Sequence, residues 1–261
     1  MGRWADMNGD GRLDYLTART NTKKGELVYF EHPVEGLQLN QPWAEHIIVE
    51  GPDVMIDIHE IKGYENSYVI FAAEFFGKKL AVYQIEKGTA KVLKSKIIDA
   101  TIDQVYSVHY TDIDADGKME LLVNNHETNN KLAAIFLYSV PADIFGDVTY
   151  AKKTIASGFK NAFSLLIPNM CPGFPYAVYP YTPEKGKGTA HILVAGDGDQ
   201  SVHLMRPFGQ GVFNRETIEV LGGTVGSLTT FDFDNDGWLE ILVPNYDKGY
   251  INVYQFYDGP N

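Results

Sequence analysis

Three segments with the same spacing of oxygen-bearing side chains decide the fold: Asp6-Met-Asn8-Gly-Asp10-Gly11-Arg-Leu-Asp14, Asp112-Ile-Asp114-Ala-Asp116-Gly117-Lys-Met-Glu120, and Asp232-Phe-Asp234-Asn-Asp236-Gly237-Trp-Leu-Glu240. A hard divalent cation such as calcium takes roughly six to eight oxygen ligands. Glycine at the sixth position permits the chain reversal that turns the next carbonyl toward the same centre. One isolated copy would be read as an Asx-turn without metal. Three matching copies instead predict up to three calcium sites, with the ligands Asp6, Asn8, Asp10, Asp14, Asp112, Asp114, Asp116, Glu120, Asp232, Asp234, Asp236 and Glu240.

The segments differ from an EF-hand in their downstream sequence. The bidentate glutamate at position 12 of an EF-hand is replaced by Thr17, Val123 and Val243. Short apolar stretches rich in β-formers come next, such as Leu-Leu-Val-Asn after Glu120. We therefore expect each calcium loop to join two strands rather than two helices.

The spacing of the loops predicts a repeat architecture. Successive loops lie about two four-stranded units apart, and degenerate copies are expected at residues 55–63 and 163–169. Each unit continues with an apolar strand, a polar turn, an aromatic strand and, in four units, a more polar outer strand. We expect an all-β, single-domain β-propeller with five blades of up to four antiparallel strands, and calcium loops between the first and second strands of three blades. The expected blades are residues 1–50, 51–100, 101–157, 158–221 and 222–261.

The loop followed by an apolar strand resembles the FG-GAP or VCBS repeats of calcium-binding propellers, such as the integrin α-chain head and several fungal lectins. The loop motif is specific in the first, third and fifth units. The resemblance implies a propeller with structural calcium and no particular reaction. Five blades depart from the six or seven that are usual for that family.

Composition excludes some partners. The 22 basic and 34 acidic residues give a net charge of −12, with no basic stripe to neutralise phosphates, so we expect no nucleic-acid partner.

No stretch approaches the roughly 18 apolar residues of a membrane-spanning helix, and no signal-peptide core follows Met1. The chain starts inside the expected first strand, so we expect either that a leader and an upstream strand have been removed or that the natural start is unusually tight. The single cysteine, Cys171, allows no intrachain disulfide and does not fix the compartment.

The candidate functional residues lie just before or within the inner strands and at the turns after the second strands, on the face opposite the calcium loops. Turn geometry alone favours Asn, Asp and Gly there. It does not account for Glu74 and His126, and a group of titratable side chains at an axial funnel suits acid–base chemistry or one further divalent ion. The predicted catalytic residues are Glu74, His126, Asp197 and His203. The predicted substrate-binding residues are Asp53, Phe75, His109, Asn125, Asp199 and Tyr246.

Three functions fit this pattern. The dissimilar turns favour one asymmetric site for a small molecule, and hence a non-redox enzyme of the lyase, cyclase or hydrolase type. The alternatives are a lectin-like propeller that binds carbohydrate and a propeller that binds other proteins. A proline- and tyrosine-rich segment, residues 168–181, is expected to resist sheet formation and to serve either as the wall of a ligand pocket or as packing.

Overall fold

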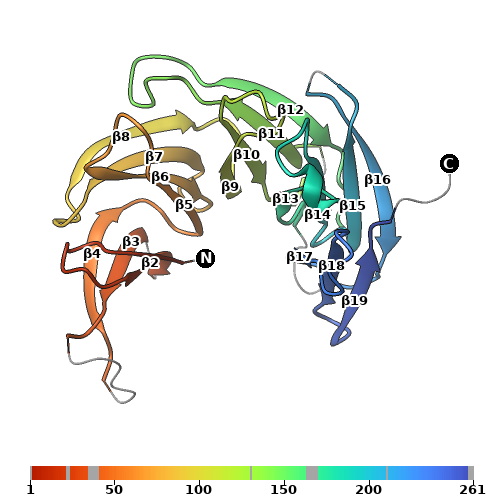
Figure 1. Ribbon diagram of the computed structural model, residues 1–261, viewed down its shortest axis with the longest axis horizontal. Coiled ribbons are helices and arrows are strands. Elements are labelled where there is room, and N and C mark those ends of the chain that lie inside the picture. The colour runs from red at the N-terminus through yellow and green to blue at the C-terminus, as the bar shows by residue number, and fades with distance from the viewer. Residues whose placement is uncertain are drawn as a thin grey trace. The chain divides into compact units, whose positions relative to one another are not determined.

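The computed structural model describes residues 2–21, 24–34, 41–129, 131–162, 170–209 and 211–257, and these form an all-β chain (Figure 1). Five antiparallel sheets follow one another along the sequence. The first contains β1 (Arg3–Ala5), β2 (Asp14–Asn21), β3 (Lys24–Glu31) and β4 (Ala44–Glu50). The second contains β5 (Met55–His59), β6 (Ser67–Glu74), β7 (Lys79–Glu86) and β8 (Val92–Asp99).

The later sheets repeat this order. The third contains β9 (Val105–Thr111), β10 (Glu120–Asn125), β11 (Ala134–Ser139) and β12 (Ala151–Ser157). The fourth contains β13 (Pro175–Val178), β14 (His191–Ala195), β15 (Ser201–Pro207) and β16 (Phe213–Val220), with a short 3-10 turn, η1 (Thr182–Glu184), after β13. The fifth has only three strands, β17 (Thr229–Phe231), β18 (Glu240–Asn245) and β19 (Tyr250–Gln255). Four-stranded meanders of this kind are propeller blades, and the predicted fold class is confirmed.

The chain forms two compact units. Unit 1 comprises Met1–Tyr110 and Pro141–Tyr150, and so holds the first two sheets and most of β9. Unit 2 comprises Thr111–Val140 and Ala151–Asn261, and so holds β10 to β12 and the last two sheets. No helix within the described ranges is long and apolar enough to span a membrane.

The burial of each strand follows its composition. The second strands β6, β10 and β14 are rich in apolar residues, and every residue of β6 is buried. The outer strands β4, β8 and β12 mix charged and polar residues with apolar ones and are exposed or half-buried. Strands covered on both faces need side chains that tolerate full burial, whereas outer strands face water. The sequence of each blade therefore sets the order of its strands from interior to surface.

The core consists of apolar layers between neighbouring sheets of one unit. In unit 1, Leu16 and Leu27 of the first sheet pack with Ile56 and Ile70 of the second. In unit 2, one layer joins Leu122 and Ile135 to Ile192 and Met205. Another joins the fourth sheet to Ile241 and Val243 of β18. Burying the inner faces of two sheets against each other is the main stabilising contribution of such an arrangement.

A strand forms where the sequence was expected to resist one. Residues 175–178 of the proline- and tyrosine-rich segment are β13, which pairs with β14 from Pro175 opposite Val194 to Val178 opposite His191. Proline is compatible with a strand when it is the first residue of an edge strand, because no ladder hydrogen bond is then lost. The prediction of a loop over these residues was wrong for this reason. The degenerate loop expected at residues 163–169 lies outside the described residues.

The calcium-type loops and the candidate turns lie at opposite ends of the same strands. The loops connect β1 to β2, β9 to β10 and β17 to β18. Glu120 begins β10, and His126 follows its last residue; Glu240 begins β18, and Tyr246 follows its last residue. Loop and turn are thus separated by the length of a strand.

Candidate functional site

Two of the three acidic loops bring their carboxylates together. Asp112, Asp114 and Glu120 each offer an oxygen atom within 4.8 Å of the others, and so do Asp232, Asp234 and Glu240. In each loop the first aspartate accepts the backbone N–H of the glycine, at 2.9 Å from Gly117 and 3.1 Å from Gly237. These groups could hold a metal ion.

Backbone bonds fix the glutamate at the end of each loop. Glu120 Oε2 accepts the N–H of Ile113 at 3.1 Å, and Glu240 Oε2 accepts the N–H of Phe233 at 2.7 Å. One oxygen of each carboxylate is therefore used by the loop, and the other is left for a ligand. Burial and the neighbouring carboxylates of Asp114, Asp112 and Asp116 raise the pKa of Glu120. A bound cation would oppose that effect.

The loop at Asp232 contains two buried oxygens without a hydrogen-bond partner among the described residues. They are Oδ1 of Asp232 and Oε1 of Glu240, and Glu240 is only 7% exposed. A buried carboxylate oxygen that bonds to nothing is costly. Both atoms belong to the carboxylate cluster, so a cation bound there would satisfy them.

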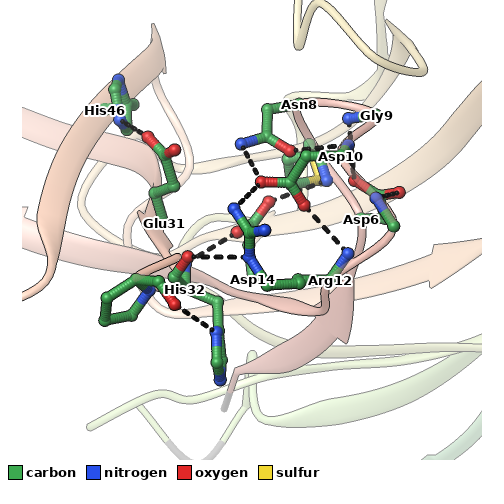
Figure 2. A network of polar contacts seen from close by, with 12 residues as sticks. Asp6, Asn8, Gly9, Asp10, Arg12, Asp14, Glu31, His32 and His46 are labelled. Atoms are coloured by element: carbon green, nitrogen blue, oxygen red, sulfur yellow. Dashed lines mark hydrogen bonds and ion pairs between the residues drawn. The ribbon is translucent and has the colours of Figure 1, made fainter. Parts of the chain in front are cut away.

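The first loop satisfies its carboxylates internally (Figure 2). Asp14 is fully buried, and its two oxygens accept the N–H groups of Met7 and His32, each at 2.9 Å. The guanidinium of Arg12 contacts Asp10 and donates through Nε to the carbonyl of His32 at 3.3 Å. Aspartate is one methylene shorter than the glutamate of the other loops, and both of its oxygens are used by the backbone. Two acidic clusters are therefore found in the part of the chain that the structure describes, where the sequence predicted up to three sites that also included Asp6 and Asn8.

The predicted site residues of unit 1 support a turn. Asp53 accepts the N–H groups of Phe75, Phe76 and Gly77 at 2.6 to 2.9 Å, so it holds the turn between β6 and β7. Glu74 is fully buried and accepts the hydroxyl of Tyr83 at 2.7 Å, while Lys79 Nζ lies 3.2 Å from its other oxygen. Burial raises the pKa of both carboxyls. Glu74 therefore has no surface that a substrate could contact in this structure.

His109 lies in a different part of unit 1. Burial lowers its pKa to about 4, although Asp57 acts in the opposite direction. Asp57 itself is bound by His59 Nε2 at 2.9 Å and by the backbone N–H of Tyr110 at 2.8 Å, with Arg3 at 3.6 Å. His109 is therefore neutral at pH 7, beside a structural ion-pair cluster.

In unit 2 the structure forms two aspartate–histidine pairs from four predicted residues. His126 Nε2 lies 3.3 Å from Asp197 Oδ2, and the side chains are 12% and 17% exposed. His203 Nε2 lies 2.7 Å from Asp199 Oδ2, and both of these side chains are 7% exposed. Asp197 has φ of 53°, which non-glycine residues seldom adopt. The His126–Asp197 pair is the more exposed of the two.

The other two predicted residues of unit 2 differ from each other. Asn125 is buried, donates to the carbonyl of Leu132 at 2.9 Å and accepts the N–H of Ala134 at 2.8 Å, which closes the turn between β10 and β11. Tyr246 is 84% exposed. A buried thiol that the site prediction left out lies near the aspartates: burial, Asp199 and Asp197 raise the pKa of Cys171 to about 12. That thiol is protonated at neutral pH and is a poor nucleophile.

Sequence reasoning did not identify a cavity beside the Asp232 loop. Its volume is about 510 Å³, and it is lined by Pro180, Tyr181, Glu184, His191, Arg206, Trp238, Gln255, Phe256 and Tyr257. Trp238 follows the loop glycine, and Tyr181 belongs to the proline- and tyrosine-rich segment. The end of that segment, Pro180 and Tyr181, thus lines a cavity, whereas Cys171, Phe174 and Val178 are buried in the core.

Comparisons with known proteins give fold similarity only. No protein-family model matches the chain, and no curated protein matches it. Among solved structures it is similar to a mutant of an apocarotenoid oxygenase from Synechocystis, with TM-score 0.48 and 14% identity over 97% of this chain and 58% of that one. It is also similar to a luciferin-regenerating enzyme, with TM-score 0.46 and 10% identity over 87% of this chain and 67% of that one. The chain spans about 58% of the length of the oxygenase.

Proposed function

We propose that this chain is a calcium-binding β-propeller protein in which the loops at Asp112 and Asp232 each bind one structural calcium ion. The observation that carries the proposal is the pair of buried oxygens of Asp232 and Glu240 that find no hydrogen-bond partner among the described residues and lie inside a carboxylate cluster. Three carboxylates, with a main-chain carbonyl from the seventh loop position, form the all-oxygen ligand set that calcium prefers. The resemblance to FG-GAP and VCBS repeats supports the same assignment.

Calcium titration of variants tests this proposal. Wild-type protein, stripped of metal, should bind two calcium ions in calorimetry. Glu240→Gln and Glu120→Gln keep the shape of each loop but remove one charged ligand, so each should weaken binding at its own loop at least about tenfold. Asp10→Asn in the first loop is the matched control, because Asp10 is exposed and its carboxylate contacts Arg12, and it should leave both sites intact. Absence of calcium binding, or loss of a site in Asp10→Asn, would overturn the assignment.

A second candidate function is a non-redox reaction of the lyase, cyclase or hydrolase type at the His126–Asp197 pair. It is favoured by the 3.3 Å separation of His126 Nε2 and Asp197 Oδ2 and by the left-handed backbone of Asp197. Unusual backbone conformations of this kind concentrate at functional sites. In this proposal His126 is the general base or acid, and Asp197 orients it and stabilises its charged form.

Turnover measurements on a panel of lactones, esters and epoxides test the second candidate. Removal of a general base costs about 10²- to 10⁴-fold in rate, so His126→Asn should lose that much of any activity found. His46→Asn, in the exposed pair with Glu31 on an outer strand, is the control. Activity that survives His126→Asn rules this pair out as the catalytic group.

A further inference from the structure

The cavity beside the Asp232 loop combines an aromatic wall with polar groups. Tyr181 and Trp238 have ring centroids 4.8 Å apart at 34°, and Tyr257 lies on the same lining. Glu184, His191, Arg206 and Gln255 supply carboxylate, imidazole, guanidinium and amide groups. The volume of about 510 Å³ is within the range of small-ligand sites. Such a lining suits a ligand with one apolar ring face and several hydroxyls.

The charges of the lining favour a neutral ligand. Arg206 Nε donates to Glu216 at 2.6 Å, so its charge is balanced by a neighbouring carboxylate. Burial and Arg206 both lower the pKa of His191, which is therefore neutral at pH 7. Glu184 remains as an acidic group on the lining. An anionic ligand would meet no unbalanced positive charge among these described lining residues.

The aromatic wall is built on the acidic loop itself. Trp238 is the residue after the loop glycine, and its N–H donates to Asp236 at 2.7 Å. The wall segment is bonded to the same loop: Thr182 N–H donates to the carbonyl of Gly237 at 2.7 Å, and Leu239 N–H donates to that of Pro180 at 2.9 Å. Gln255 also donates to Asp236, at 3.2 Å. The loop conformation therefore sets the positions of Trp238, Tyr181 and Gln255.

From these contacts we propose that the cavity is a binding site for a neutral saccharide, with the wall formed by the Tyr181–Trp238 pair packing against a pyranose ring and Glu184, His191, Arg206 and Gln255 binding its hydroxyls. Aromatic faces bury the C–H surface of such a ring, and planar polar groups bind neighbouring hydroxyls. Saccharide binding depends on the cation at the Asp232 loop, and this dependence rests on the proposed calcium site. The site lies at the loop end of the strands, away from the His126–Asp197 pair.

Binding of cellobiose and N,N′-diacetylchitobiose, measured by calorimetry and by tryptophan fluorescence in saturating calcium, tests the site. Wild-type protein should bind at least one of them, with a dissociation constant on the order of millimolar. Trp238→Ala should weaken binding at least about tenfold, and Trp238→Phe less, because a ring remains. The matched control is Trp43→Ala, since Trp43 lies in an apolar pocket of unit 1 with Trp4 and Tyr15. The proposal is overturned if the wild-type protein binds neither sugar, or if Trp43→Ala weakens sugar binding as much as Trp238→Ala does. It is also overturned if free tryptophan binds more strongly than either sugar.

Metal dependence is tested separately. Asp232→Asn should weaken both calcium binding at its loop and saccharide binding, whereas Asp6→Asn in the first loop should change neither. If neither Asp232→Asn nor a chelator affects saccharide binding, the dependence on calcium is overturned. The saccharide site itself would then still be supported by the effect of Trp238→Ala. Calcium binding without any saccharide binding overturns the saccharide site and leaves the proposed calcium function intact.

Discussion

At the level of single residues, Gly237 makes a close contact that its counterpart Gly117 lacks. Both have positive φ, 93° and 84°, so any side chain would be strained there. A Cβ on Gly237 would also lie 2.7 Å from Cε2 of Tyr181, whereas a Cβ on Gly117 would meet nothing within 4 Å among the described residues. Of these two loop glycines, only Gly237 is in contact with an aromatic wall.

Substitution by alanine should therefore lower the free energy of unfolding by different amounts at the two glycines. Gly117→Ala should lower the free energy of unfolding by about 1 to 2 kcal/mol, the cost of a left-handed conformation. Gly237→Ala should lower the free energy of unfolding by more than Gly117→Ala does, because the clash of the new Cβ with Tyr181 adds to the backbone strain. It should also displace Tyr181. Urea unfolding measures the first effect, and the near-ultraviolet signal of the aromatic pair measures the second. Equal effects of the two substitutions would contradict the close contact at Gly237.

His109 should make stability depend on pH. Its pKa in the folded protein, about 4, is below the ordinary value of 6.5, so its contribution is fully present above pH 6.5 and is lost as the pH falls through 4. The loss amounts to up to about 3 kcal/mol. His109→Gln should flatten the plot of unfolding free energy against pH between these values. An unchanged slope in His109→Gln would show that the imidazole titrates normally.

At the level of secondary-structure elements, the turn between β14 and β15 depends on the absence of a side chain at Gly196. Gly196 does not have positive φ, yet a Cβ there would lie 1.7 Å from Oδ1 of Asp199. Asp199 accepts the N–H of Ser201 at 3.0 Å and binds His203. Glycine is therefore required for space at this position and not for backbone freedom.

Gly196→Ala should push Asp199 away from His203 and cost about 2 kcal/mol or more, from overpacking and from an unpaired buried imidazole. Gly226→Ala is the matched control, because a Cβ there would lie at an ordinary 3.9 Å from Asp197 Oδ2 and its φ is not positive. Thermal unfolding of the two variants tests this. A near-neutral Gly196→Ala would mean that Asp199 can move without loss.

The elements were predictable where local sequence determines them. Buried strands such as β6 and β10 follow from apolar runs, and the loop glycines follow from the reversal they make possible. The strand β13 was missed because proline content argues against a strand unless its edge position is known. The sequence also did not predict that the backbone N–H groups of Met7 and His32 occupy both oxygens of Asp14, because His32 is far from Asp14 in sequence. The cavity at Trp238 brings together residues of several elements, and no local pattern shows that.

At the level of the whole molecule, both acidic clusters found among the described residues belong to unit 2. Calcium at about 100 times its dissociation constant would stabilise the unit that binds it by about 2.7 kcal/mol. Calcium should therefore stabilise unit 2 more than unit 1. Unit 1 has its own apolar core and a first loop that is already satisfied by backbone donors and Arg12.

Chelation should lower the hydrogen-exchange protection of β10, β14 and β18 by up to about 100-fold, while β2 and β6 keep theirs. Exchange read by mass spectrometry with and without a chelator measures both units in one sample. Glu240→Gln should reproduce the effect for β18 without a chelator. Uniform loss of protection in both units would show that they unfold together.

The single thiol provides a chemical reporter of the same unit. Cys171 is fully buried and has a strongly raised pKa, and it is the only cysteine in the sequence. Alkylating reagents modify exposed thiolates, so reaction at neutral pH requires a local opening that exposes the side chain of Cys171, whose backbone is bridged to Glu127. The rate of alkylation by iodoacetamide therefore reports how often unit 2 opens locally around Cys171, without any engineered label. Chromatography of the modified fraction over time is enough to measure this rate.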